Sequence, residues 1–249
     1  MLGFEINKSA PELAVAEIEA VTGKKGKLKG NFYIIDYPYD HKFARLAFTK
    51  RIMAGYFGSH MFYRALVCDV NKANHYEQRR SHLLPAQHPA MTHPRLARAM
   101  INLANANEIL DPFCGAGGIL IEAALCSISA VGFDIDPIML KRAKKNLKYF
   151  KIKDVKLKLQ DATTFKSSVK VVVTDLPYAK NTKVTAPIEE LYAKFLRNLK
   201  KNNIERAVIG FPDTVNYKQI IRDAGFKIKN EFTYYLHRSL SKKIIVLSV

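Results

Sequence analysis

The chain has 249 residues, of which 48% are hydrophobic, enough to fill a sizeable core. Lys and Arg number 40 against 22 Asp and Glu, and the formal net charge of +18 favours a polyanionic partner such as nucleic acid, although a lysine-biased proteome would also explain it. The three cysteines form no CxxC pair, which excludes a zinc knuckle and a disulfide framework, and no stretch has the length of an uncharged membrane span, so we expect a cytoplasmic protein without a membrane partner.

The first part of the chain predicts a small α+β domain over residues 1–65. Residues 2–6 have the pattern of a strand, a helix follows and ends at Gly23, and residues 31–37 are rich in β-branched and aromatic residues, as strands are. Residues 41–57 show helical periodicity and predict a second helix.

Residues 66–90 predict a linker, because the segment is polar and contains prolines. Four histidines lie in it or just beyond it, at His75, His82, His88 and His93. Their spacing matches no known metal cluster, so we predict no metal site.

The remaining residues, 91–249, alternate regularly between helix and strand patterns. Such βα repeats build a mostly parallel α/β sheet with helices on both faces. The last two strands follow each other without a helix and predict an antiparallel hairpin at one edge. The predicted helices cover 95–105, 117–127, 137–150, 188–200 and 215–225, and the predicted strands before the hairpin cover 108–113, 130–135, 155–159, 169–176 and 206–211.

A glycine-rich loop, residues 111–118, follows the first strand of this sheet, where such folds bind their ligands. The dinucleotide fingerprint fails there, because the position of its third glycine is occupied by Leu120. Asp111, at the end of the strand, would repel a pyrophosphate and attract an ammonium group. The loop therefore favours S-adenosylmethionine, which carries an ammonium and a sulfonium but no phosphate.

Two further carboxylates end the next two strands. We expect Asp134 to accept hydrogen bonds from the ribose hydroxyls and Asp161 to accept one from the adenine amino group. Each alone could be an ordinary turn or cap residue, but three at successive strand ends beside a glycine loop predict a cofactor site. The predicted cofactor-binding residues are Asp111, Cys114, Gly115, Gly117, Asp134, Ile135, Asp161 and Ala162.

The tetrapeptide Asp175-Leu176-Pro177-Tyr178 ends the fourth strand and is the predicted catalytic set. The exocyclic amine of a base is a poor nucleophile, because its lone pair is delocalised into the ring. The Asp175 carboxylate and the Leu176 carbonyl would accept its two hydrogens and localise that pair on nitrogen. Pro177 would stiffen the turn and Tyr178 would stack on a splayed-out base. The alternative interpretation is an ordinary turn after a strand.

Several motifs in order carry a family resemblance: HPAMTHPRLARAMINLA, ILDPFCGAGGILIEA, VGFDIDPIMLKRAKKNL and TDLPYAK. Over about residues 76–249 the chain resembles the archaeal and eukaryotic tRNA guanosine-10 N2-methyltransferases of the THUMP-associated group. The resemblance implies a class I methyltransferase, Rossmann-like sheet preceded by a small ferredoxin-like α+β domain. It also implies methylation of guanosine N2 in tRNA at position 10, giving m2G or m2,2G. Ribosomal RNA guanine N2, DNA adenine N6 and a non-catalytic RNA-binding scaffold are the alternatives.

The sequence departs from that family in two ways. The THUMP domain that grips tRNA in relatives has no room between the two predicted domains, so either basic residues such as Lys24–Lys29 and Arg79–Arg80 hold tRNA or a helper subunit does. Leu176 stands where relatives commonly carry Pro, and Ala179 where they commonly carry Gly. Because a leucine carbonyl can accept a hydrogen bond as a proline carbonyl does, we expect activity to survive.

Overall fold

The computed structural model describes residues 1–55, 65–70, 74–178, 188–237 and 240–248. The chain divides into two compact units, Met1–Arg79 and Arg80–Val249. Within the described residues, every helix is too short or too polar to cross a bilayer. The predicted boundaries at residues 65 and 91 remain predictions, and part of the predicted linker contributes a strand to the first unit.

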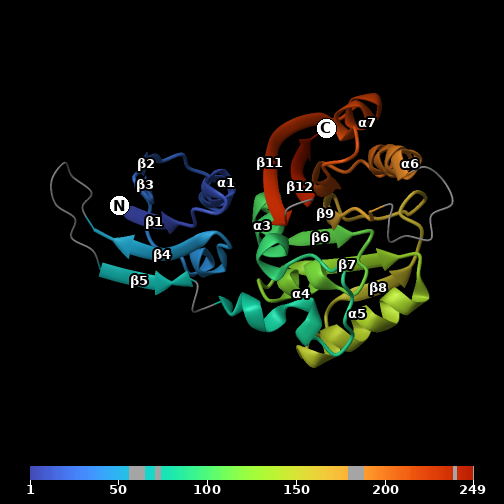
Figure 1. The fold of residues 1–249 in the computed structure, drawn as a ribbon, viewed down its shortest axis with the longest axis horizontal. Coiled ribbons are helices and arrows are strands. Elements are labelled where there is room, and N and C mark those ends of the chain that lie inside the picture. Colours follow the sequence, from blue (N-terminus) through green and yellow to red (C-terminus); the bar gives the residue numbers. More distant parts are fainter. Residues whose placement is uncertain (56–64, 71–73, 179–187, 238–239, 249) are drawn as a thin grey trace. The chain divides into compact units, whose positions relative to one another are not determined.

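The first unit is a five-stranded sheet in the order β2-β3-β1-β4-β5, in which every pair is antiparallel (Figure 1). The first strand lies between β3 and β4, as in the split βαβ arrangement of ferredoxin-like domains. The predicted α+β unit is therefore confirmed, with one added edge strand. Its elements are β1 (Leu2–Ile6), α1 (Pro11–Thr22), β2 (Lys27–Lys29), β3 (Phe32–Ile35), the 3-10 helix η1 (His41–Arg45), β4 (Thr49–Ala54), β5 (Ala65–Asp69) and the 3-10 helix η2 (Tyr76–Arg79).

The helix predicted over residues 41–57 is wrong. Only the short η1 forms there, and β4 follows and pairs with β1. The buried Glu17 carboxylate accepts hydrogen bonds from the backbone N–H groups of Ala47 and Phe48, at 2.8 and 2.9 Å. A helix would need these N–H groups for its own carbonyls, so this long-range contact overrides the local helical spacing.

The second unit is a seven-stranded sheet in the order β11-β12-β10-β9-β6-β7-β8. Strands β6 to β10 are parallel, and the final hairpin joins the sheet antiparallel through β12. This confirms the predicted mostly parallel sheet with an antiparallel C-terminal hairpin. Its elements are η3 (Ser81–Leu83), α3 (Pro94–Ala104), β6 (Glu108–Asp111), α4 (Gly118–Ala124), β7 (Ser129–Asp134), α5 (Pro137–Tyr149), β8 (Lys156–Leu159), β9 (Val171–Asp175), α6 (Ile188–Lys201), β10 (Arg206–Pro212), α7 (Tyr217–Asp223), β11 (Lys227–His237) and β12 (Leu240–Ser248).

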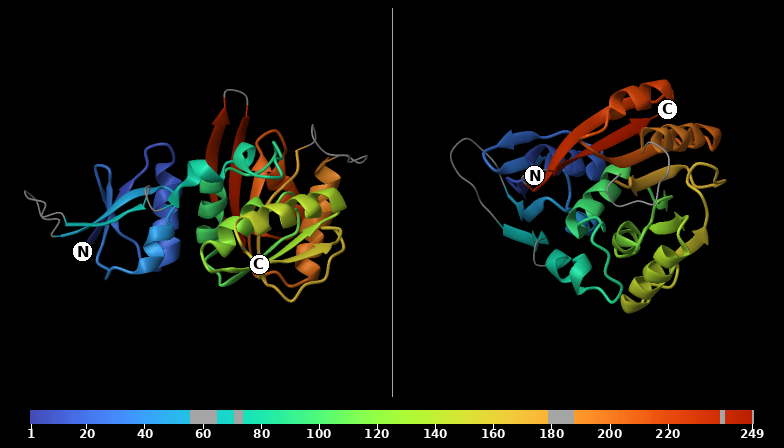
Figure 2. Two further views of the ribbon diagram at one scale, coloured as in Figure 1. Left: turned by 90° about the horizontal axis from the view of Figure 1, so that it is seen from below. Right: turned by 45° about the vertical axis from the view of Figure 1, so that its right-hand side comes forward.

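Helices cover both faces of this sheet, as Figures 1 and 2 show. On one face α3, α4 and α5 pack against the strands and one another, and α6 and α7 lie together on the other. The core under α6 is apolar and aromatic, with Phe195, Leu199 and Phe211 fully buried. Burial of apolar side chains is the dominant favourable contribution to folding, so this core stabilises the sheet.

The order of the strands reverses between β6 and β9. From β6 the chain proceeds outward to β7 and β8, and then returns to β9 on the other side. Parallel strands end at the same sheet edge, so Asp111, Asp134 and Asp175, which close β6, β7 and β9, meet there. Ligands of such sheets bind at this reversal.

Candidate functional site

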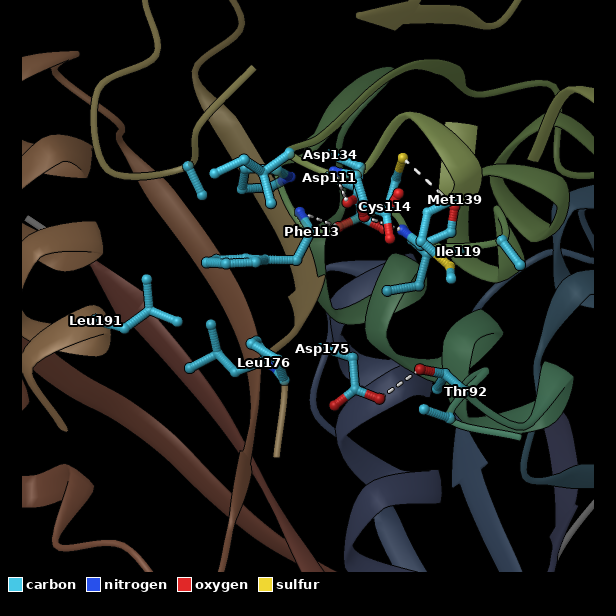
Figure 3. A pocket seen from close by; sticks show the side chains of 18 of the residues that line it. Thr92, Asp111, Phe113, Cys114, Ile119, Asp134, Met139, Asp175, Leu176 and Leu191 are labelled. Atoms are coloured by element: carbon cyan, nitrogen blue, oxygen red, sulfur yellow. Dashed lines mark hydrogen bonds between the residues drawn. The ribbon is translucent and has the colours of Figure 1, made fainter. Parts of the chain in front are cut away.

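A cavity of about 800 Å³ lies at the carboxyl ends of β6, β7 and β9, within the size range of ligand pockets (Figure 3). Every predicted site residue lines it except Gly117. The carboxylates of Asp111 and Asp134 come together beside Cys114, and Asp175 lies apart from them with its carboxylate toward Thr92.

The glycine turn has the backbone that its sequence predicts. Gly115 and Gly117 have φ angles of +50° and +90°, which other residues adopt at a cost. Gly117 caps α4, and a Cβ atom there would lie 3.3 Å from the Cβ of Ala143 on α5. Gly117 therefore allows the turn to pack against α5 and does not line the cavity. The Cys114 N–H donates to the Phe133 carbonyl at 2.9 Å, which fastens the turn to β7.

Asp111 is 1% exposed at the base of the cavity. Its Oδ1 accepts a hydrogen bond from the Thr174 hydroxyl at 2.7 Å and from the Phe113 N–H at 3.2 Å. Burial raises the pKa of this carboxyl to about 7, against the two hydrogen bonds, which lower it. Its charge is therefore set by pH in the neutral range and by any cation that enters the cavity.

Asp134 is held by the backbone on both oxygens. Its Oδ2 accepts from the Gly115 N–H at 2.8 Å and its Oδ1 from the Asp136 N–H at 2.9 Å, while burial raises its pKa. Each oxygen keeps a second lone pair for a hydroxyl donor. The neighbouring Ile135 is 70% exposed although it is apolar and lines the cavity, which suits a flat apolar ligand surface.

Asp161 and Ala162 lie on the far side of Asp134, just after β8. The Thr163 N–H and hydroxyl donate to Asp161 Oδ1 at 2.7 and 2.8 Å. Ala162 is buried beneath the cavity wall. These two residues close the end of the cavity where the sequence predicts the adenine.

The Asp175-to-Tyr178 turn is held by hydrogen bonds at successive residues. The Leu176 N–H donates to the Gly210 carbonyl at 3.0 Å, and the Tyr192 hydroxyl donates to the Pro177 carbonyl at 2.6 Å. Burial raises the pKa of Tyr178, so this phenol stays neutral. Ala179, which stands where relatives commonly carry Gly, lies outside the described residues.

Asp175 has two partners that sequence analysis missed. Its Oδ2 accepts from the Thr92 hydroxyl at 2.5 Å and forms an ion pair with the Lys242 ammonium. Its Oδ1 is buried and accepts no hydrogen bond from the described residues. Lys242 comes from the final hairpin, 67 positions away, and a lone strand lysine gives no sequence signal of burial.

The segment predicted as a linker forms one wall of the cavity. Asn146 of α5 is buried, and its amide bonds the backbone of Ala86 in both directions, at 3.0 and 3.1 Å, and the Ala116 carbonyl at 3.0 Å. Asn146 thereby ties this segment to the glycine turn. No group of three or more potential metal ligands occurs in the described parts of the chain.

A profile of the RMKL-like methyltransferase domain, UPF0020, matches residues 82–242. The chain is 35% identical over 182 residues to a tRNA (guanine(10)-N2)-dimethyltransferase of Pyrococcus abyssi, covering 71% of this chain and 55% of that protein. It is 36% identical over 186 residues to the protein of that name from Methanothermobacter thermautotrophicus, covering 72% and 55%. The chain thus spans about half the length of these curated relatives.

Among solved structures, TrmN from Thermus thermophilus aligns with a TM-score of 0.60 at 15% identity, over 99% of this chain and 98% of that one. This likeness concerns the fold alone. The profile match spans more than half of the 249 residues and contains the whole glycine turn and the Asp175-to-Tyr178 turn. The protein belongs to the RMKL-like methyltransferase domain family, UPF0020.

Proposed function

We propose that the protein methylates the exocyclic N2 amine of a guanosine in tRNA, with S-adenosylmethionine as the methyl donor. The observation that carries the proposal is the meeting of Asp175, with one unused buried oxygen, and the Asp111 and Asp134 carboxylates in one cavity. The curated relatives are named for this chemistry at guanine 10 of tRNA, and we propose the same position here.

The cavity fits the proposed donor in three respects. Asp111 presents a buried carboxylate to an ammonium group, Asp134 keeps lone pairs for two hydroxyls, and exposed Ile135 offers an apolar surface to an adenine. Its volume of about 800 Å³ exceeds what a single nucleoside needs, which leaves room for a base above the Asp175-to-Tyr178 turn.

The reaction requires that the amine lone pair be made available. Asp175 Oδ1 and the Leu176 carbonyl would accept hydrogen bonds from the two N–H groups of the amine. These bonds would direct the nitrogen lone pair toward the cofactor side of the cavity. Bound S-adenosylmethionine supplies an electrophilic methyl group whose carbon–sulfur bond breaks as the carbon–nitrogen bond forms. The alkylated amine is strongly acidic, so the Asp175 carboxylate can take its proton and pass it to solvent.

The charge of the chain supports an RNA substrate. Its excess of 18 positive charges attracts a phosphate backbone over distances limited by salt screening. Lys24, Lys25, Lys27 and Lys29 lie close together in the first unit, and we propose that they contact tRNA, with a helper subunit as the alternative grip. A tRNA substrate also supports action in the cytoplasm.

Methyl transfer from tritiated S-adenosylmethionine tests the proposal, with tRNA transcripts carrying guanosine or adenosine at position 10. We expect methylation only of the guanosine transcript, with N2-methylguanosine found by mass spectrometry of the nucleosides. Asp175→Ala should lower kcat by about 10³-fold while leaving cofactor binding intact, because only transition-state interactions are lost. Asp223→Ala is the matched control, since that carboxylate is exposed on α7 and, among the described residues, accepts a hydrogen bond from Gln219 alone.

Three results would contradict the proposal. Methylation of ribosomal RNA or of adenine in DNA, with tRNA unmodified, would assign a different substrate. A fully active Asp175→Ala protein would remove the role given to that carboxylate. Absence of S-adenosylmethionine binding by calorimetry would favour a non-catalytic RNA-binding scaffold.

A further inference from the structure

We infer that Lys242 is a positioning residue of the active site, which fixes the rotation of the Asp175 carboxylate so that Oδ2 is occupied and Oδ1 is left to accept the substrate amine. The inference rests on the proposed function and assigns a role to the final hairpin that neither the family match nor the relatives' names give. It makes the antiparallel strand β12 part of the catalytic unit.

The ion pair is buried on both sides. The side chains of Lys242 and Asp175 are 5% and 10% exposed, and Lys242 lies on β12, which pairs directly with β10. A buried lysine is costly unless a carboxylate compensates it, and the same holds for a buried carboxylate without a cation. The two opposite charges therefore compensate each other in a place that is largely shielded from water.

The pair leaves the two carboxylate oxygens unequal. Oδ2 is taken by the Lys242 ammonium and the Thr92 hydroxyl, whereas Oδ1 accepts nothing from the described residues. Oδ1 lies over Gly210 of β10, where an added Cβ atom would come within 2.6 Å of it. The absent side chain at Gly210 thus gives Oδ1 its space, and the polar bonds of Oδ2 fix the rotation of the carboxylate.

Lys242 also reaches the other end of the same turn. Its Nζ lies 5.4 Å from the centre of the Tyr178 ring, in the range of a cation–π contact. One face of that ring is therefore occupied, and a base can stack only on the opposite face. A single side chain from β12 thereby orients both the proposed amine acceptor and the proposed stacking platform.

Other charged groups near Asp175 do not replace this cation. Asp111 of β6 adds negative charge, Tyr178 and Tyr192 are neutral phenols, and Asp213 after β10 adds a further carboxylate. Arg98 of α3, the helix that packs on β9, is engaged with Glu122 at 2.7 Å. Without Lys242, Oδ2 of Asp175 keeps only the Thr92 hydroxyl as a partner among the described residues, and the carboxylate can turn away from its observed orientation.

The test compares Lys242→Met, which keeps the length of the side chain without its charge, with Lys243→Met. Lys243 is the adjacent residue on β12, and its ammonium bonds the Thr233 hydroxyl at 2.8 Å instead. We expect Lys242→Met to lower kcat about 100-fold with little change in KM for tRNA, because displacement of a reacting group by about 1 Å has that cost. Lys243→Met should follow the wild type, and Lys242→Arg should restore most activity at neutral pH.

A second measurement does not depend on any substrate. A crystal structure of Lys242→Met should show the Asp175 carboxylate turned away from its orientation in the wild type, whereas Lys243→Met should keep that orientation. An unchanged kcat, or an Asp175 carboxylate that keeps its orientation in Lys242→Met, would overturn the inference. If the wild type methylates no guanosine, the proposed function fails, and the comparison of the two variant structures still decides whether Lys242 fixes the Asp175 carboxylate.

Discussion

Two buried carboxylates on neighbouring strands have different partners. Asp111 on β6 accepts hydrogen bonds only from neutral donors in the described residues, and burial raises its pKa to about 7. Asp175 on β9 is less deeply buried, with 10% of its side chain exposed, and has the Lys242 ammonium against it. The difference shows which carboxylate has no cation of its own. The Asp111 end of the cavity suits a positively charged ligand, whereas at the Asp175 end the protein itself supplies the counter-charge.

After the loss of the Asp175 carboxylate itself, the largest expected effect comes from displacing it, which breaks the Asp175 end alone. Gly210→Ala puts a methyl group within 2.6 Å of Asp175 Oδ1, which must rotate away. We expect kcat for tRNA to fall about 100-fold, because displacement of a reacting group by about 1 Å has that cost. Calorimetry should show unchanged S-adenosylmethionine affinity. Equal kcat values for the variant and the wild type would show that Oδ1 does not need its observed position.

The pH dependence of cofactor binding tests the Asp111 end. An ammonium ligand favours the carboxylate form, and the free protein holds this carboxyl with a pKa raised to about 7. Affinity should therefore be full above about pH 7 and weaken as pH falls below it, by up to about tenfold per unit, with proton release on binding. Titration calorimetry in buffers of different ionisation enthalpy measures both quantities.

Asp111→Asn is the control for that prediction. The amide cannot ionise, so affinity should be low and nearly constant between about pH 6 and 8. A wild-type affinity that rises as pH falls would mean that the ligand prefers the protonated carboxyl, and the assignment of an ammonium to this end would be wrong.

The smallest expected effect concerns the adenine surface. Ile135→Ala removes apolar area from the cavity wall and should weaken cofactor binding by about 1 kcal/mol, about fivefold. Ile138→Ala is the matched control, because Ile138 is 52% exposed on the same segment but does not line the cavity. Equal losses in the two variants would place the adenine elsewhere.

The two ends also differ in how far the sequence predicts them. At the Asp111 end the contacts are local or arise from strand order: Gly115 and Asp134 are 19 positions apart, and βα repeats bring such strand ends together. At the Asp175 end, Thr92 is 83 positions away and Lys242 is 67. Nothing in the composition of either segment indicates its partner, so the tetrapeptide was predictable and its neighbours were not.

The same distinction explains the fold. The second unit follows its hydrophobic pattern in most elements, and β8, which has no buried residue, is the exception. In the first unit, residues 41–57 have helical spacing, yet Glu17 binds two backbone N–H groups of that segment and β4 pairs with β1. The side chain that decided this local structure lies 30 and 31 positions away in sequence from the two N–H groups that it binds.

The position of β12 has a consequence for the order of folding. This strand inserts between β10 and β11, so it pairs on both sides only after the two strands preceding it in sequence are in place. Its pairing with β11 is a local hairpin, whereas β6 and β9 pair through Leu110 and Val172, which are far apart in sequence. Contacts between distant residues cost more chain entropy to close, so a refolding molecule would form the hairpin that carries Lys242 before the donor pocket, and turnover would recover only when the two have docked.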